Sequence, residues 1–136
     1  TSLVLWSNSN ANNYLILQPS WGKTGIGTYF PQAKLDVNGT AVIGASGSVL
    51  NEIIKVTVAK NLASIPAGSS NIETFSVTNA AITSSVMISP TNSLPNGLLI
   101  AYARVSSAGV VEVKFTNVSS ATIDPVAMDF YITVVR

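Results

Sequence analysis

The strongest structural signal in the chain is an alternation of apolar and polar residues that recurs along its second part. Apolar residues occupy every other position in four runs, at residues 54–58, 75–77, 111–115 and 130–134. Successive side chains of a β-strand point to opposite faces of a sheet, so this pattern is typical of antiparallel strands with one buried face. The chain is therefore predicted to be all-β.

Turn signals separate these runs and indicate a compact domain from residue 53 to residue 136. Proline, glycine, asparagine and serine gather at residues 66–68, 90–92, 95–97, 107–109 and 124–125. The run at 98–105 is apolar on both faces, which predicts a central strand or one covered on both sides. Six or seven short strands at this spacing predict a jelly-roll-like antiparallel β-sandwich.

Residues 1–52 differ from the rest, because their apolar runs are very short and polar turns separate them. No helical periodicity appears there, and the Gly-Ala-Ser-Gly-Ser sequence at 44–48 has the composition of a hinge or linker. Strands this short cannot enclose a core of their own. We therefore predict that residues 1–52 form a β-structured shaft or connector, which is stable when several copies of the chain, three by expectation, wrap together.

Composition excludes several classes of function. The chain of 136 residues has 10% charged residues, a net charge of +1, no cysteine and no histidine. No charge field attracts nucleic acid, and no apolar run approaches the roughly 20 residues of a membrane helix. Thiolate and imidazole metal sites and a Ser-His-Asp triad are excluded on chemical grounds. We expect no metal, no cofactor and no insertion into a membrane.

Carboxylates are the remaining acid–base groups, and they form no recognisable catalytic pair. Asp124 and Asp129 flank Pro125, where a turn and the start of a strand explain them. The Gly-Ile-Gly sequence at 25–27 lacks the third glycine and the following helix of a dinucleotide site. We therefore expect that the protein is not an enzyme, and cleavage of a polysaccharide is disfavoured in particular.

Residues 25–40 combine a Gly-x-Gly turn, a proline, a short alternating strand and an Asn-Gly turn. They read Gly-Ile-Gly-Thr-Tyr-Phe-Pro-Gln-Ala-Lys-Leu-Asp-Val-Asn-Gly-Thr and resemble the GIGT…P.AKLDVNG segment of phage tail fibres and fibrous bacterial surface proteins. In those families the segment belongs to a thin β-structured shaft before a terminal domain. The second region, with Ser-Pro at 89–90, Leu-Pro at 94–95 and Ile-Asp-Pro at 123–125, is similar to a small virion domain of tailed phages.

The two resemblances imply a homotrimeric piece of a phage-type fibre, located on a virion or on an extracellular surface appendage. Its implied partners are its own copies and other virion or appendage proteins. The implied function is attachment to a host or cell surface, with a glycan as the expected ligand and several weak identical sites acting together. Two alternatives stay open: a purely structural virion cap or head-decoration fibre, and a bacterial surface adhesin.

Aromatic rings and amide side chains are the candidates for contact with a glycan. Trp6, Trp21 and Tyr29 lie in the first region, where they either stack on sugar rings or pack between subunits. Asn92 and Asn96 lie in a predicted loop of the sandwich and have amide groups suited to sugar hydroxyls. These five residues are the predicted ligand-binding residues.

Arg104 is a charged residue inside the apolar run at 98–105. A charge in a covered strand is costly unless it is paired, so this arginine predicts a carboxylate partner. Asp124, Asp129 and Glu73 are the expected partners, within one subunit or across an interface. Two other charged residues, at 112 and 114, lie on one face of a strand and predict exposed cross-strand pairs.

Two Asn-x-Ser/Thr triplets begin at Asn38 and Asn117 and match the glycosylation sequon. Each asparagine also sits where a turn or a strand end would use its side chain to bond the nearby backbone. This local structural role is the one we expect at both positions.

Overall fold

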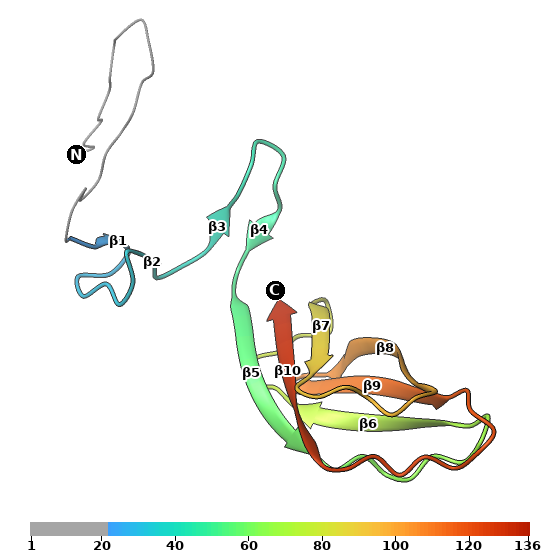
Figure 1. Cartoon of the computed structure of the whole chain (residues 1–136). Coiled ribbons are helices and arrows are strands. Elements are labelled where there is room, and N and C mark those ends of the chain that lie inside the picture. Colours follow the sequence, from blue (N-terminus) through green and yellow to red (C-terminus); the bar gives the residue numbers. More distant parts are fainter. Residues whose placement is uncertain (1–21) are drawn as a thin grey trace, which may run out of the picture. The chain divides into compact units, whose positions relative to one another are not determined.

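The computed structural model describes residues 22–136, and within them it contains β-strands but no helix (Figure 1). The prediction of an all-β fold is confirmed for this part of the chain. The chain divides into two compact units, residues 1–41 and residues 42–136. The assignment of residues 1–52 to a shaft and of residues 53–136 to a head stays a prediction.

The second unit contains two three-stranded antiparallel sheets that pack face to face as a sandwich (Figure 1). The first sheet has the order β5 (Ile53–Lys60), β10 (Met128–Val135), β7 (Ser85–Pro90). The second has the order β6 (Ser70–Ser76), β9 (Val110–Asn117), β8 (Leu98–Ser107). The chain changes sheet at every connection from β5 to β10 except the β8–β9 hairpin. Three of the four alternating runs fall on β5, β9 and β10, and the run at 75–77 begins at the end of β6 and extends one residue beyond it.

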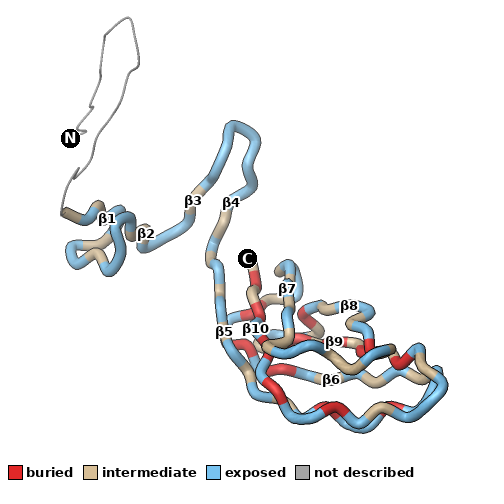
Figure 2. Tube along the Cα trace, viewed as in Figure 1, coloured by how far each residue is buried: buried red, intermediate tan, exposed pale blue. Residues whose placement is uncertain are grey.

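Three phenylalanine rings form the centre of the core. Phe130 of β10 meets the edges of Phe75 on β6 and Phe115 on β9, with ring centroids 5.3 Å and 5.9 Å away. Because Phe130 belongs to one sheet and its two partners to the other, these contacts join the sheets directly. Figure 2 shows the buried residues within the sandwich, and residues 22–52 include none.

Strand β8 differs from the prediction of a central or doubly covered strand. It is an edge strand of its sheet, and several of its side chains, including Leu99 and Tyr102, are exposed. The register with β9 shifts between Ile100 and Tyr102, which marks a β-bulge. The run of apolar residues is therefore explained by the bulge, which changes the face that each side chain occupies, and not by cover on both faces.

Asn117, at the end of β9, is completely buried and has four hydrogen bonds. Its Nδ2 donates to the carbonyl oxygens of Ile65 at 2.9 Å and Ala121 at 2.8 Å. Its Oδ1 accepts from the backbone N–H of Ser119 at 2.9 Å and from the Ser119 hydroxyl at 2.7 Å. The expected local role is confirmed, and Asn117 also ties this turn to the loop before β6, where Ile65 bonds Ile123.

The short segment before β5 contains two further strands. β3 (Ala41–Val42) and β4 (Val49–Leu50) pair with each other. The Gly-Ala-Ser-Gly-Ser sequence at 44–48 lies in the turn between them, with the Gly47 N–H donating to the Gly44 carbonyl at 3.3 Å. The prediction of a hinge or linker is therefore wrong at this place, because the small residues serve a turn.

In the described part of the first unit, the segment that contains the Gly-x-Gly sequence folds into two short paired strands and the loop between them. β1 (Thr24–Ile26) and β2 (Leu35–Val37) run parallel although only the loop at 27–34 joins them. Both glycines are required by close backbone contacts. A Cβ on Gly25 would lie 2.6 Å from the Thr28 carbonyl oxygen. At Gly27, where φ is 73°, a Cβ would lie 2.7 Å from the Asn38 carbonyl oxygen.

Side chains of the same segment close the loop with hydrogen bonds to the backbone. The Asp36 carboxylate accepts from the Gln32 N–H at 2.8 Å, and Asn38 Nδ2 donates to the Gly27 carbonyl at 3.1 Å. The side-chain amide of Asn38 thus bonds the nearby backbone, which is the local role expected for this asparagine. The loop keeps its shape through these hydrogen bonds and the close backbone contacts at the two glycines, and not through a buried core.

Phe130→Ala should lower the free energy of unfolding by about 3–5 kcal/mol, because it removes both inter-sheet ring contacts and leaves a cavity. Tyr131→Ala is the matched control, since Tyr131 is the next residue of β10 but faces outward and is 54% exposed. Urea denaturation followed by far-UV circular dichroism measures both. Equal losses for the two variants would contradict the proposed core.

Asn117→Ala should lower the free energy of unfolding by about 1–3 kcal/mol, because buried backbone groups lose their partners. Asn117→Asp should be at least as damaging, since it places an oxygen against two carbonyl oxygens. Asn92→Ala, at an exposed loop position, is the control and should change little. Thermal and urea unfolding of the three variants test this, and a tolerated aspartate would count against the described network.

Candidate functional site

The outer face of the sheet β6–β9–β8 carries a compact group of aromatic and charged side chains. Tyr102 and Arg104 lie on β8, and Glu112 and Lys114 lie on β9. The strand register places Tyr102 opposite Lys114 and Arg104 opposite Glu112. We call these four residues the Tyr102 cluster.

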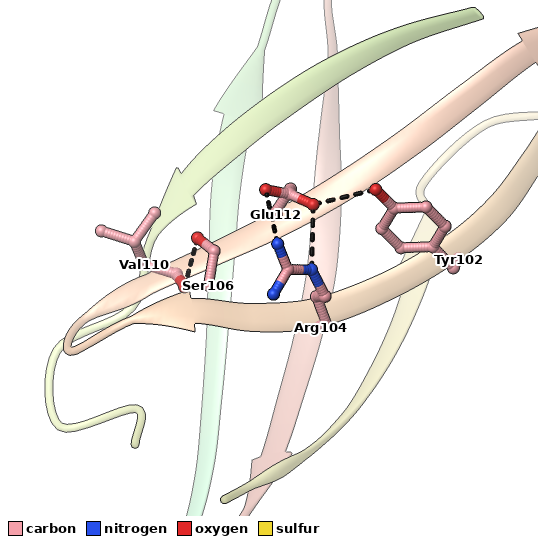
Figure 3. Close-up of polar contacts among 5 residues, drawn as sticks. All are labelled: Tyr102, Arg104, Ser106, Val110 and Glu112. Atoms are coloured by element: carbon pink, nitrogen blue, oxygen red, sulfur yellow. Dashed lines mark hydrogen bonds and ion pairs between the residues drawn. The ribbon is translucent and has the colours of Figure 1, made fainter. Parts of the chain in front are cut away.

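Glu112 is the centre of the hydrogen bonds in this cluster (Figure 3). Its Oε1 accepts from the Tyr102 hydroxyl at 2.9 Å and from Arg104 Nε at 3.0 Å, and its Oε2 accepts from Arg104 Nη2 at 3.3 Å. The Glu112 side chain is 15% exposed, whereas the Arg104 side chain is 59% exposed. The carboxylate thus lies beneath two side chains that it holds in fixed orientations and that solvent reaches.

The β-bulge in β8 explains why Tyr102 and Arg104 face outward. Leu98, at the start of the strand, is buried against the core, and a strict alternation would place residues 100, 102 and 104 on the same side. The register shift between Ile100 and Tyr102 exchanges the two faces for the rest of the strand. After the shift, Val105 points to the core and its neighbours on β8 do not. A bulge re-aims side chains in this way.

Hydrogen bonding sets the protonation behaviour of the cluster. The bonds from Tyr102 and then from Arg104 lower the pKa of Glu112. The bond to Glu112 raises the pKa of Tyr102 and also raises the pKa of Arg104. Glu112 therefore stays ionised and Tyr102 stays protonated at neutral pH, and with Lys114 the cluster has an excess of positive charge.

The partner of Arg104 is not one of the three carboxylates that were expected. Glu112 takes that role, and Glu73 pairs instead with Lys60 at 3.0 Å. The expectation was wrong because it assumed a covered strand, whereas the bulge places Arg104 on the open face. The predicted cross-strand pair of Glu112 is confirmed, although the Glu112 side chain is largely covered. Lys114 forms no such pair within residues 22–136.

The predicted ligand-binding residues do not come together in one site. Trp6 and Trp21 lie outside the described residues. Tyr29 lies in the 27–34 loop and is 97% exposed. Asn92 and Asn96 are exposed in the connection from β7 to β8, and neither side chain makes a hydrogen bond within residues 22–136.

A hollow of ≈ 770 Å³ lies at one end of the sandwich, between the β6–β7 connection and the β8–β9 hairpin. Apolar residues and glycine line it together with five polar residues, which are Ser76, Thr78, Asn79, Thr83 and Arg136. The Arg136 guanidinium already donates to the Asn79 carbonyl at 3.2 Å and pairs with a carboxylate at 3.5 Å. The charged residue of the lining is therefore already paired, whereas the Arg104 guanidinium of the Tyr102 cluster keeps N–H donors that Glu112 does not use.

Residues 22–136 contain no group of three or more acidic residues placed to hold a metal ion. Asp124 and Asp129 are exposed, and the structure reports no side-chain hydrogen bond for either within this part of the chain.

Within residues 22–136, no helix is long and apolar enough to cross a membrane.

Sequence reasoning missed Tyr102 and Lys114 as possible ligand contacts. The two charged residues at 112 and 114 indicated one exposed face of β9, but the residues opposite them were not predictable. An alignment of β8 with β9 that allows for a bulge would have paired Tyr102 with Lys114 and Arg104 with Glu112.

Comparison with known proteins gives no assignment. No protein-family model matches the chain. No curated protein and no solved structure matches it either. The resemblance to phage fibres therefore stays a prediction.

Glu112→Gln should lower the melting temperature slightly at pH 7, because the charge-assisted bonds to Arg104 and Tyr102 weaken. A carboxylate whose pKa is lowered by folding stabilises the folded state above its ordinary value of 4.5 and loses that effect as pH falls through the lowered value. The gap between wild type and variant should therefore close on acidification. Scanning fluorimetry across this pH range tests it, with Asp124→Asn as control, and a gap that widens would contradict it.

Proposed function

We propose that this chain is part of a homotrimeric fibre or surface appendage that attaches its carrier to a host or cell surface. The observation that supports the assembly is the exposure of apolar side chains in the single chain from β1 to the first residue of β5. Eight of them are more than half exposed: Ile26, Tyr29, Phe30, Leu35, Val42, Ile43, Val49 and Ile53.

These side chains need a partner surface for energetic reasons. Burial of one large apolar side chain contributes about 1.5–3 kcal/mol, and no residue in 22–52 is buried. The same segment holds its shape with hydrogen bonds, so it does not need a core to be ordered locally. Copies of the chain that wrap together would cover the apolar groups of every copy at once, and the resemblance to fibre shafts supports three copies.

Attachment is the function that fits such an assembly with an open sandwich face. The Tyr102 cluster presents an aromatic ring, cationic donors and apolar neighbours, which are the groups that contact sugars. Three identical faces on one particle would combine weak single contacts into firm binding. We therefore propose a glycan of the host or cell surface as the ligand.

A purely structural cap or decoration fibre is the second candidate. The observation that favours it is the exposure of apolar residues between β1 and β5, which proposed assembly would explain without any ligand. A glycan array probed with the labelled, assembled protein separates the two, because only attachment predicts reproducible binding to one class of glycan. An array and a host-cell binding assay that both stay blank would favour the cap.

The full-length protein should be a trimer by light scattering at micromolar concentration, and its thermal unfolding should depend on protein concentration. Phe30→Ser combined with Leu35→Ser should weaken assembly, because both side chains are exposed in the single chain. The control is Asn92→Ser combined with Asn96→Ser, which should leave the mass unchanged. A stable wild-type monomer would refute the proposed assembly.

A further inference from the structure

We propose that the outer face of the sheet β6–β9–β8, centred on Tyr102 and Arg104, binds a saccharide that carries a carboxylate group. The inference names the site and the ligand class for the attachment function and rests on that proposed function. Its basis is the arrangement of the Tyr102 cluster and of the residues beside it.

The side chains of Tyr102 and Arg104, which would contact the ligand, are held in place by Glu112 before a ligand binds. Glu112 holds the Tyr102 hydroxyl at 2.9 Å and the Arg104 guanidinium by two bonds, at 3.0 Å and 3.3 Å. Binding therefore costs little additional side-chain entropy. Tyr102 is 39% exposed, so part of its ring is open to solvent and can receive the apolar face of a sugar ring.

The unused donors of the cluster match an anionic group. Arg104 donates to Glu112 through Nε and one hydrogen of Nη2, which leaves Nη1 without a partner among residues 22–136. Lys114 lies opposite Tyr102 in the strand register, and its ammonium group makes no ion pair within the same residues. Glu112 neutralises one of the two cations, and a carboxylate on the ligand would neutralise the other.

The surroundings indicate an extended ligand and not a single sugar. Ile72 of β6 lies beside Lys114 in the same cross-strand row as Tyr102, and Leu99 lies one row further along β8. Both are about half exposed. Beside Leu99, the Ser70 and Thr116 hydroxyls bond each other at 2.9 Å on the same face. Apolar side chains and hydroxyls in successive rows of a three-stranded face are suited to several consecutive sugar rings.

A second copy of the chain fits this face less well than a saccharide does. Like faces packed together would bring the Arg104 and Lys114 cations of both copies close, which repels them. The centre of a protein interface is also poor in charged residues. The exposed apolar groups suited to self-assembly lie instead in residues 26–53.

The test measures binding of the assembled full-length chain to two matched probes, an oligogalacturonate and its methyl ester, which differ in charge. Calorimetry should give binding of the acid at least about 10-fold tighter than of the ester, and added salt should weaken it. Sialyllactose and lactose form a second pair of probes with the same contrast. Similar affinities for acid and neutral partner in both pairs would overturn the proposed ligand class.

Variants locate the site. Tyr102→Ala should abolish binding of both members of a pair, and Arg104→Gln should remove the preference for the acid, whereas Arg104→Lys should retain part of it. Tyr131→Ala, an exposed aromatic on the opposite sheet, is the control and should bind like the wild type. Light scattering and circular dichroism confirm that each variant is assembled and folded.

The outcomes distinguish this inference from the attachment function. Unchanged acid binding in folded Tyr102→Ala and Arg104→Gln variants would overturn the site. Failure of all four probes, together with binding to other glycans on the array, would overturn the ligand class and leave attachment standing. A blank array with no binding to host cells would overturn both.

Discussion

The contact on which the sandwich depends is the one that Phe130 makes with Phe75 and Phe115. Phe130 lies on the central strand of one sheet and Phe115 on the central strand of the other, so this contact fixes how the sheets face each other. Because successive side chains of a strand point to opposite faces of the sheet, the residues that face the core also determine which residues face outward. The positions of Glu112 and Lys114 follow directly from the burial of Val111, Val113 and Phe115 on the same strand.

The two proposed roles of the chain depend on different interactions. Assembly relies on apolar side chains that the single chain leaves in water, from Ile26 to Ile53. Recognition relies on the Tyr102 cluster, in which one carboxylate orders a tyrosine and an arginine on a surface with few charges elsewhere. Because the chain has few charged residues, few other charged groups would attract or repel an ionic ligand at short range near this cluster.

The fold class was predictable because the alternation on β5, β9 and β10 is a local property of the sequence. The place of β8 was not, since a bulge between Ile100 and Tyr102 depends on the partner strand and leaves no pattern in the apolar run itself. The partner of Arg104 was missed for the same reason. Small residues at 44–48 were also ambiguous, because glycine and serine serve turns and linkers alike.

The Gly-x-Gly segment has a consequence for how such a chain can evolve. Its shape comes from glycines whose Cβ would collide with nearby carbonyl oxygens, and from bonds that Asp36 and Asn38 make to their own loop. None of these contacts uses a residue outside 24–40. The local conformation of this segment therefore does not depend on the domain that follows it. Recombination can join such a segment to a different terminal domain without changes in either part.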